Sequence, residues 1–115
     1  MTADRSVLIV EDDPNIQVLL RRVVASRCTN VDVVGDGQEA IERLGHTAYD
    51  IVVLDIMLPR ANGFEVAETI RKMHPQPRLI VLSAIGRYYG DRFWDGVTVL
   101  QKPFDMEVFE GALLA

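Results

Sequence analysis

Residues that could carry chemistry lie directly after four short apolar runs of the sequence. Three adjacent acids come after the first run, and an acid, a serine and a lysine come after later runs: Glu11, Asp12, Asp13, Asp55, Ser83 and Lys102. If these side chains meet, their carboxylates repel one another, and a divalent cation that prefers hard oxygen ligands, such as Mg²⁺, removes that cost. A lysine and a hydroxyl group can bind the oxygens of a phosphoryl group. The set therefore suits transfer of a phosphoryl group to a carboxylate nucleophile.

Alternating apolar runs and helical stretches indicate how these residues are positioned. Apolar runs of strand length predict strands at residues 7–10, 31–34, 51–54, 79–82 and 97–100. Helical spacing predicts a helix that begins at Pro14 with Asp13 as its N-cap, and further helices at 38–44, 63–73 and 105–114. The apolar residues expected on the buried face of the first helix are Ile16, Leu19, Leu20, Val23 and Val24.

This order of elements predicts an α/β fold, a (βα)5 doubly wound parallel five-stranded sheet with the flavodoxin-like strand order 2-1-3-4-5. Near-continuous apolar strands are typical of a parallel sheet that is covered on both faces. Right-handed crossovers then place helices on both sides. In such open sheets the ligand site lies beyond the carboxyl ends of the strands. We therefore expect the acids, the serine and the lysine to converge on one edge of the sheet.

A nucleotide or flavin pocket is the competing kind of site at that edge. Such a pocket binds phosphate through main-chain N–H groups of a loop rich in glycine, serine or threonine after the first strand. Here residues 11–14 of that loop are three acids followed by a proline, which has no N–H. The loop therefore disfavours a flavodoxin-type cofactor binder.

The composition fits one globular domain. The chain has 115 residues and a net charge of −5, which disfavours non-specific binding to nucleic acid. No apolar run approaches the roughly 20 residues that span a bilayer. Residues 1–6 lack the apolar core of a signal peptide, so a cytoplasmic protein without a membrane partner is expected. Cys28 is the only cysteine, so no disulfide can form within the chain.

Four strings in this chain, VLIVEDDP, DIVVLDIMLPRANGFEV, LIVLSA and LQKPF, resemble the receiver domains of bacterial response regulators. They occur in the family's order and span nearly the whole chain, so residues 1–115 are interpreted as one receiver domain. The resemblance implies that Asp55 is the phosphoacceptor. It also implies that Mg²⁺ is bound by Glu11, Asp12, Asp55 and the main-chain carbonyl of Met57.

Because three acids are adjacent, the register of the metal-binding pair has an alternative, Asp12 with Asp13. We prefer Glu11 with Asp12, since Pro14 needs a cap before it and Asp13 can supply one.

The same resemblance assigns the remaining residues of the site. Ser83 and Lys102 are expected to contact the phosphoryl group, and Ala84 is a small residue that keeps the approach open. Lys102–Pro103 matches a usual cis peptide of the family, and Gly63 matches the glycine that closes the loop after the acceptor strand.

The chain departs from the family between its fourth and fifth strands. Val99 stands where receivers usually carry an aromatic residue, and residues 85–96 have poor helical periodicity and three glycines. We expect the fourth helix to be short, irregular or absent. The aromatic residues of this segment either pack on the sheet or form a surface for self-association or an output partner; they are Tyr88, Tyr89, Phe93 and Trp94.

The resemblance implies a signalling switch rather than an enzyme. A histidine kinase or histidine phosphotransfer protein would donate the phosphoryl group, and partner binding would change through residues 84–115. The only reactions expected are phosphorylation of Asp55 and its hydrolysis, which should be slow because Met57 and Ile85 are apolar and cannot position a water molecule. The alternative is an interaction module with a receiver fold that acts without phosphorylation. The chain is expected to be either a stand-alone receiver or a fragment of a longer regulator or hybrid kinase.

An aspartyl phosphatase is disfavoured, because that class has a second acid two residues after the nucleophile and this chain has Met57.

Overall fold

The computed structural model describes residues 3–58, 60, 62–84 and 93–115 of the chain. Five parallel strands form one sheet. In the order in which they lie side by side, the strands are β2 (Cys28–Val34), β1 (Ala3–Val10), β3 (Ile51–Asp55), β4 (Arg78–Ser83) and β5 (Thr98–Gln101). The predicted order 2-1-3-4-5 is confirmed.

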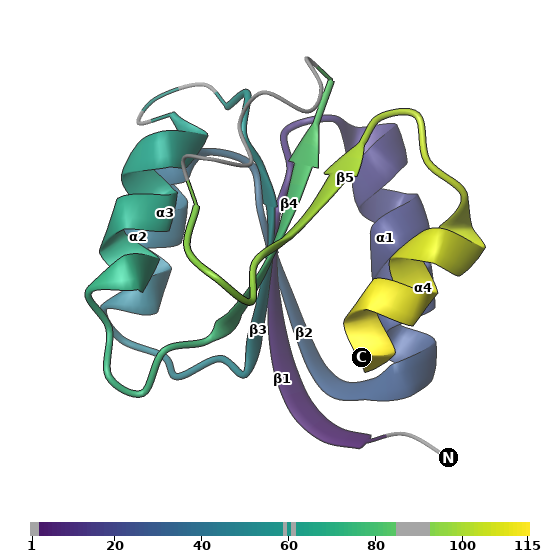
Figure 1. The fold of residues 1–115 in the computed structure, drawn as a ribbon, viewed down its shortest axis with the longest axis horizontal. Coiled ribbons are helices and arrows are strands. Elements are labelled where there is room, and N and C mark those ends of the chain that lie inside the picture. Colours follow the sequence, from purple (N-terminus) through teal and green to yellow (C-terminus); the bar gives the residue numbers. More distant parts are fainter. Residues whose placement is uncertain (1–2, 59, 61, 85–92) are drawn as a thin grey trace.

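Helices cover both faces of this sheet, as Figure 1 shows. The helices α2 (Gly37–Leu44) and α3 (Gly63–Arg71) lie on one face. The helices α1 (Pro14–Arg27) and α4 (Met106–Leu114) lie on the other. None of the helices in the described residues is long and apolar enough to cross a membrane.

Strict alternation along the central strands builds one core on each face of the sheet. In β1, Val7 and Ile9 belong to the cluster under α1 and α4, whereas Leu8 and Val10 belong to the cluster under α2 and α3. The strands β3 and β4 alternate in the same way, and their apolar residues are almost fully buried. Burial on both faces explains why these strands read as continuous apolar runs.

Side-chain caps fix where three helices begin. Asp13, Asp36 and Asn62 each accept a hydrogen bond from a main-chain N–H in the first turn of α1, α2 and α3. The predicted cap at Asp13 is therefore confirmed. Since each helix starts at the carboxyl end of a strand, these caps also set the conformation of the loops at that edge of the sheet.

Some sequence expectations differ from the structure in detail. Leu19, predicted on the buried face of α1, is 46% exposed. Leu20 and Val24, four residues apart, form the fully buried stripe, and Leu19 lies beside that stripe. The helix predicted at 63–73 ends at Arg71. Most of the irregular segment predicted at 85–96 lies outside the described residues, and the described part, 93–96, contains no helix.

Candidate functional site at the carboxyl edge of the sheet

Parallel pairing brings the predicted site residues to one edge of the sheet. Glu11 directly follows β1, Asp55 is the last residue of β3, and Ser83 is the last residue of β4. Lys102 directly follows β5. In the register of the sheet Asp55 pairs with the residue before Ser83, so the carboxyl ends of β3 and β4 lie level. The expected convergence on this edge is therefore observed.

Lys102 joins the two buried acids. Its Nζ donates to Glu11 Oε1 at 2.8 Å and to Asp55 Oδ2 at 2.9 Å. Both bonds are charge-assisted, because they join an ammonium group to carboxylates. Since Glu11 is 0% exposed and Asp55 is 4% exposed, the carboxylates are shielded from water. A single ammonium group thus partly compensates two carboxylates.

Burial and charge perturb the pKa values at this edge. Burial raises the pKa of Glu11 from 4.5 to about 7, although the hydrogen bond from Lys102 opposes the rise. Burial by itself would lower the pKa of Lys102, but its hydrogen bonds to Glu11 and Asp55 outweigh burial and hold that pKa above its usual value. Burial of the Glu11 carboxylate therefore costs free energy that the bond from Lys102 only partly offsets.

Three acids at this edge are close enough to share one metal ion. Ligand atoms of Glu11, Asp12 and Asp55 all lie within 4.8 Å of one another. Asp12 is exposed, whereas the other two are buried. Carboxylate oxygens are the hard ligands that Mg²⁺ prefers, and an ion reached from the exposed Asp12 side could keep water molecules. The donor set fits a divalent cation of this type.

Asp13, the third acid of the turn between β1 and α1, is the N-cap of α1. Asp13 Oδ1 accepts from the N–H of Asn15 at 2.8 Å and caps α1. Asp13 N–H in turn donates to Glu11 Oε2 at 3.1 Å. This arrangement corresponds to the preferred register, in which Glu11 and Asp12 face Asp55 and Asp13 caps the helix.

The loop after β3 holds the Asp55 carboxylate in place. The N–H of Met57 donates to Asp55 Oδ1 at 3.0 Å. Further along the loop, the N–H of Gly63 donates to the carbonyl of Ile56 at 3.1 Å. A Cβ at Gly63 would lie 2.4 Å from Ile56 Cα, so only glycine allows this close approach. Gly63 closes the loop as expected from the sequence.

Ser83 and the peptide after Lys102 complete the edge. Ser83 is fully buried, and its carbonyl accepts from the N–H of Lys102 at 2.8 Å. The Lys102–Pro103 peptide is cis, as the resemblance implied. The side chain of Met57 is 54% exposed at the rim.

Gln17 also belongs to this edge, although the sequence did not identify it. Its side-chain amide donates to the main-chain carbonyl of Glu11 at 2.5 Å. The only available signal was its spacing, since a residue four positions after the cap Asp13 lies over the first turn of the helix. That spacing alone does not identify which acceptor an amide will bind.

The aromatic residues that the structure describes pack on the sheet. Phe93 stacks on Phe64 of α3 with ring centroids 6.0 Å apart, and Trp94 contacts Phe93 edge-on. Phe93, Trp94 and Val99 are partly buried against the core under α2 and α3. Of the two alternatives given for the aromatic residues of this segment, Phe93 and Trp94 therefore follow the first and pack on the sheet. Tyr88, Tyr89 and Ile85 lie outside the described residues, and a partner surface stays a prediction.

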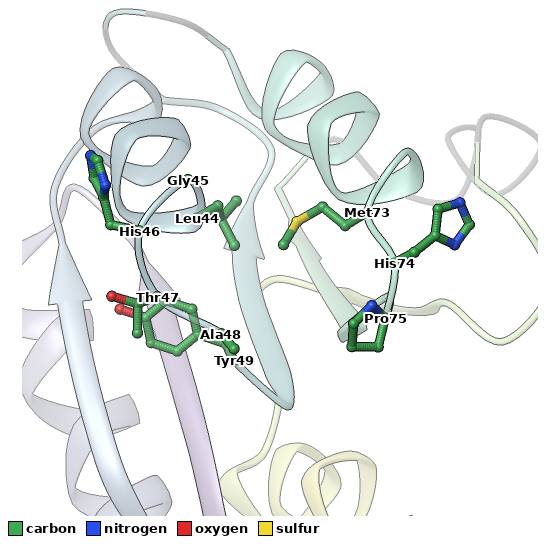
Figure 2. Close-up of a pocket in the computed structure, with 9 residues that line it drawn as sticks. All are labelled: Leu44, Gly45, His46, Thr47, Ala48, Tyr49, Met73, His74 and Pro75. Carbon is green, nitrogen blue, oxygen red and sulfur yellow. The ribbon is translucent and has the colours of Figure 1, made fainter.

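A hollow lies at the opposite edge of the sheet, between the ends of α2 and α3 (Figure 2). It has a volume of about 240 Å³. His46 and His74 stand on opposite sides of it and point away from each other, so they do not form a joint ligand site (Figure 2). Nothing in this hollow resembles the charged arrangement at the carboxyl edge.

Comparisons with known proteins agree with this fold. The family model of the response regulator receiver domain matches residues 7–113. The chain is 37% identical to the transcriptional regulatory protein TcrA of Mycobacterium tuberculosis, over 88% of this chain and 41% of that protein. It is 32% identical to the response regulator ArlR of Staphylococcus aureus, over 88% of this chain and 47% of that protein. This chain thus spans less than half the length of these relatives.

Solved receiver domains share the same architecture. The receiver domain of the Francisella response regulator 1452 has a TM-score of 0.84 at 24% identity, and 96% of this chain and 94% of that chain are covered. A BeF3-activated DrrB receiver domain has a TM-score of 0.85 at 22% identity, with coverage of 97% and 96%. At these identities the likeness supports the fold.

Fold and edge together define a doubly wound α/β domain with an acidic, lysine-bearing site at the carboxyl ends of its strands. The chain belongs to the response regulator receiver domain family. Members of this family are signalling domains of two-component systems rather than classical enzymes.

Proposed function

We propose that this chain is a phosphorylation-dependent switch in which Asp55 accepts a phosphoryl group from a phosphohistidine donor. The observation that carries the proposal is the arrangement around Asp55. Lys102 Nζ lies 2.9 Å from one Asp55 oxygen, and oxygens of Glu11 and Asp12 lie within 4.8 Å of the Asp55 carboxylate. This combination of acids and lysine serves phosphoryl transfer to a carboxylate better than it serves stability.

In the proposed phosphoryl transfer, each residue around Asp55 has a separate role. Glu11, Asp12, Asp55 and the main-chain carbonyl of Met57 would hold a Mg²⁺ ion, which supplies positive charge to the phosphoryl oxygens when bound. An Asp55 oxygen attacks phosphorus, a P–O bond forms, and the P–N bond to the donor imidazole breaks with its electron pair left on the imidazole. Lys102 binds a phosphoryl oxygen, and the Ser83 hydroxyl donates to another. The main-chain N–H of Met57 keeps Asp55 oriented for attack.

The switch itself is a change of populations. New contacts from the phosphoryl group to Lys102 and Ser83 favour one arrangement of the surface formed by residues 84–115. Coupling of about 1–3 kcal/mol is typical for such two-state elements. The donor is a histidine kinase or a histidine phosphotransfer protein. Tyr88 and Tyr89 are proposed to contribute to self-association or to binding of an output partner, whereas Phe93 and Trp94 pack against the core under α2 and α3.

Hydrolysis of the acyl phosphate is proposed to be slow. Met57 is exposed at the rim of the site and its side chain is apolar, so it cannot hold a water molecule in line with the phosphorus. Ile85, the second apolar residue invoked for this property, lies outside the described residues. Decay of the phosphorylated domain over minutes or longer is expected, and loss within seconds would contradict it.

Acetyl phosphate tests the proposal directly. We expect the chain with acetyl phosphate and Mg²⁺ to gain one phosphoryl group by intact mass, and Asp55→Asn or added EDTA to abolish the gain. If the chain is never phosphorylated and binds its partner equally well as Asp55→Asn, the alternative of a phosphate-independent interaction module is correct.

A further inference from the structure

Asp12 is the exposed member of the acidic cluster, and its carboxylate is not fixed by burial. Glu11 and Asp55 are held by packing and by Lys102. Within the part of the chain that the structure describes, no ion pair or side-chain hydrogen bond restrains Asp12 in this way. The position of its carboxylate therefore depends on the main chain of the turn on either side of it.

Gln17 holds that turn at both ends. Its main-chain N–H donates to the carbonyl of Asp13 at 2.9 Å, which is the first hydrogen bond of α1. Its side-chain Nε2 donates to the carbonyl of Glu11 at 2.5 Å. Asp12 lies between these two carbonyls. Gln17 thus fixes the Glu11–Asp12 peptide directly before the exposed acid and the Asp13–Pro14 peptide one residue after it.

The other polar groups of Glu11 are engaged as well, and the Gln17 bond is the one that holds its carbonyl. The N–H of Glu11 donates to the carbonyl of Val34 at 3.1 Å. Its two carboxylate oxygens accept from Lys102 Nζ and from the N–H of Asp13. Without the Gln17 side chain, the carbonyl of Glu11 loses this partner and the Glu11–Asp12 peptide gains freedom to rotate.

We propose that Gln17 is a positioning residue, which orients Asp12 toward Asp55 and thereby raises the affinity of the acidic edge for a divalent cation. The inference rests on the proposed function, since it concerns the same metal site. The reason is preorganisation: a ligand already held near its bound position loses less conformational freedom when the cation binds. Repulsion from Glu11 and Asp55 would otherwise drive the exposed Asp12 carboxylate outward.

The competing role is purely structural, with Gln17 serving only to stabilise the start of α1. Gln17→Met separates the two roles, because methionine has similar length and helix propensity but cannot donate a hydrogen bond. Val18→Met is the matched control, since Val18 neighbours Gln17 on α1 and is 57% exposed.

The experiment measures Mg²⁺ affinity by calorimetric titration and urea unfolding in EDTA and in Mg²⁺. We expect Gln17→Met to weaken Mg²⁺ binding by about three- to tenfold, the effect of one hydrogen bond of ordinary net strength. The extra stability conferred by a fixed Mg²⁺ concentration should shrink correspondingly. Val18→Met should leave both quantities unchanged.

Two results would overturn the inference in different ways. If Gln17→Met lowers stability in EDTA but binds Mg²⁺ as tightly as the unmodified chain, Gln17 is structural only and the metal site stands. If the unmodified chain shows no Mg²⁺ binding that Asp12→Asn and Asp55→Asn remove, the proposed metal site is wrong and the inference is wrong with it.

Discussion

Polar side chains are paired differently at the two ends of the strands, the carboxyl edge and the opposite edge of the sheet. At the carboxyl edge, two buried acids share one lysine while a third acid lies close by. Burial there raises the pKa of Glu11 to about 7. Toward the opposite edge, Tyr49 is paired with a carboxylate and Arg78 with main-chain carbonyls, although burial and the nearby Arg5 lower the pKa of Arg78. The Tyr49 hydroxyl donates to Asp32 Oδ2 at 2.6 Å.

Arg78 is the clearest example of pairing at that opposite edge. It is the first residue of β4, and its guanidinium donates to the carbonyls of Ala112 and Leu113 in the last turn of α4 and of Ala115 directly after that helix. A cation at a helix C-terminus satisfies carbonyls that lack partners within the helix. Under the proposed function, the carboxyl edge serves binding and the opposite edge serves stability. Substitutions at the two edges should therefore have separable effects.

The largest expected effect is on how the free energy of unfolding depends on pH, which should differ between the unmodified chain and Glu11→Gln. The pKa of Glu11 is raised when the chain is folded, so between pH 4.5 and about 7 the folded chain holds a proton that the unfolded chain has released. The free energy of unfolding should therefore fall as pH rises, by at most about 1.4 kcal/mol per pH unit. Urea unfolding in EDTA should give this decline for the unmodified chain, relative to Glu11→Gln.

Glu110→Gln is the control for that comparison, because Glu110 forms an ion pair with Arg27 on the half-exposed surface between α1 and α4. Its stability should follow the pH dependence of the unmodified chain. If Glu11→Gln also follows it, burial of the Glu11 carboxylate at the carboxyl edge does not cost stability and the comparison fails.

Gly63→Ala is expected to damage both stability and binding. The added Cβ would lie 2.4 Å from Ile56 Cα, and neither backbone can move without disturbing the loop that holds Asp55. Overpacking of this kind costs about 1–3 kcal/mol. Urea unfolding measures the loss, and Mg²⁺ titration should show weaker binding.

Gly111→Ala provides the matched glycine. Gly111 lies in α4 with nothing within 4 Å of the added Cβ, so the substitution should raise stability by about 0.5–1 kcal/mol. Equal effects of the two glycine substitutions would contradict the role assigned to the close approach at Gly63.

Arg78→Met should lower stability without altering the carboxyl edge. Loss of hydrogen bonds from a charged donor to the α4 carbonyls is expected to cost about 2 kcal/mol. Arg71→Met is the control, because Arg71 is 63% exposed and its ion pair with Glu68 should contribute almost nothing. A Mg²⁺ affinity that falls in Arg78→Met would show that the two edges are coupled.

The smallest effect is expected for Tyr49→Phe, which removes the hydrogen bond to Asp32. Asp32 keeps its ion pair with Arg43 at 3.5 Å, so a loss of about 1 kcal/mol in the free energy of unfolding is expected. Phosphorylation by acetyl phosphate should be unchanged. A slower reaction in this variant would contradict the separation of the edges.

The sequence predicted the fold and the meeting of the site residues because two simple patterns determine both. Apolar runs such as residues 51–54 require burial on both faces of a parallel sheet, and parallel strands bring the residues at their carboxyl ends to a single edge. Asp55, Ser83 and Lys102 could be placed without knowledge of any side-chain contact. The cap at Asp13 was equally predictable, since Pro14 marks the first turn.

Other features depend on three-dimensional packing that the sequence pattern does not contain. Leu19 and Leu20 are adjacent and equally apolar, and only the rotation of α1 against the sheet decides that Leu20 is buried. Gln17 could have bonded to solvent or to several acceptors. The stacking of Phe93 on Phe64 joins segments about 30 residues apart, which no local periodicity predicts.

The central claim is that Asp55, among the acids gathered at the carboxyl edge, receives the phosphoryl group. Borohydride reduces a phosphorylated aspartate to homoserine, so reduction after treatment with acetyl phosphate and Mg²⁺, with peptide sequencing by mass spectrometry, locates the acceptor. We predict homoserine at position 55 and at no other acid of the edge. Homoserine at position 12 or 13, or none at position 55 in a chain that has gained a phosphoryl group, would contradict the claim.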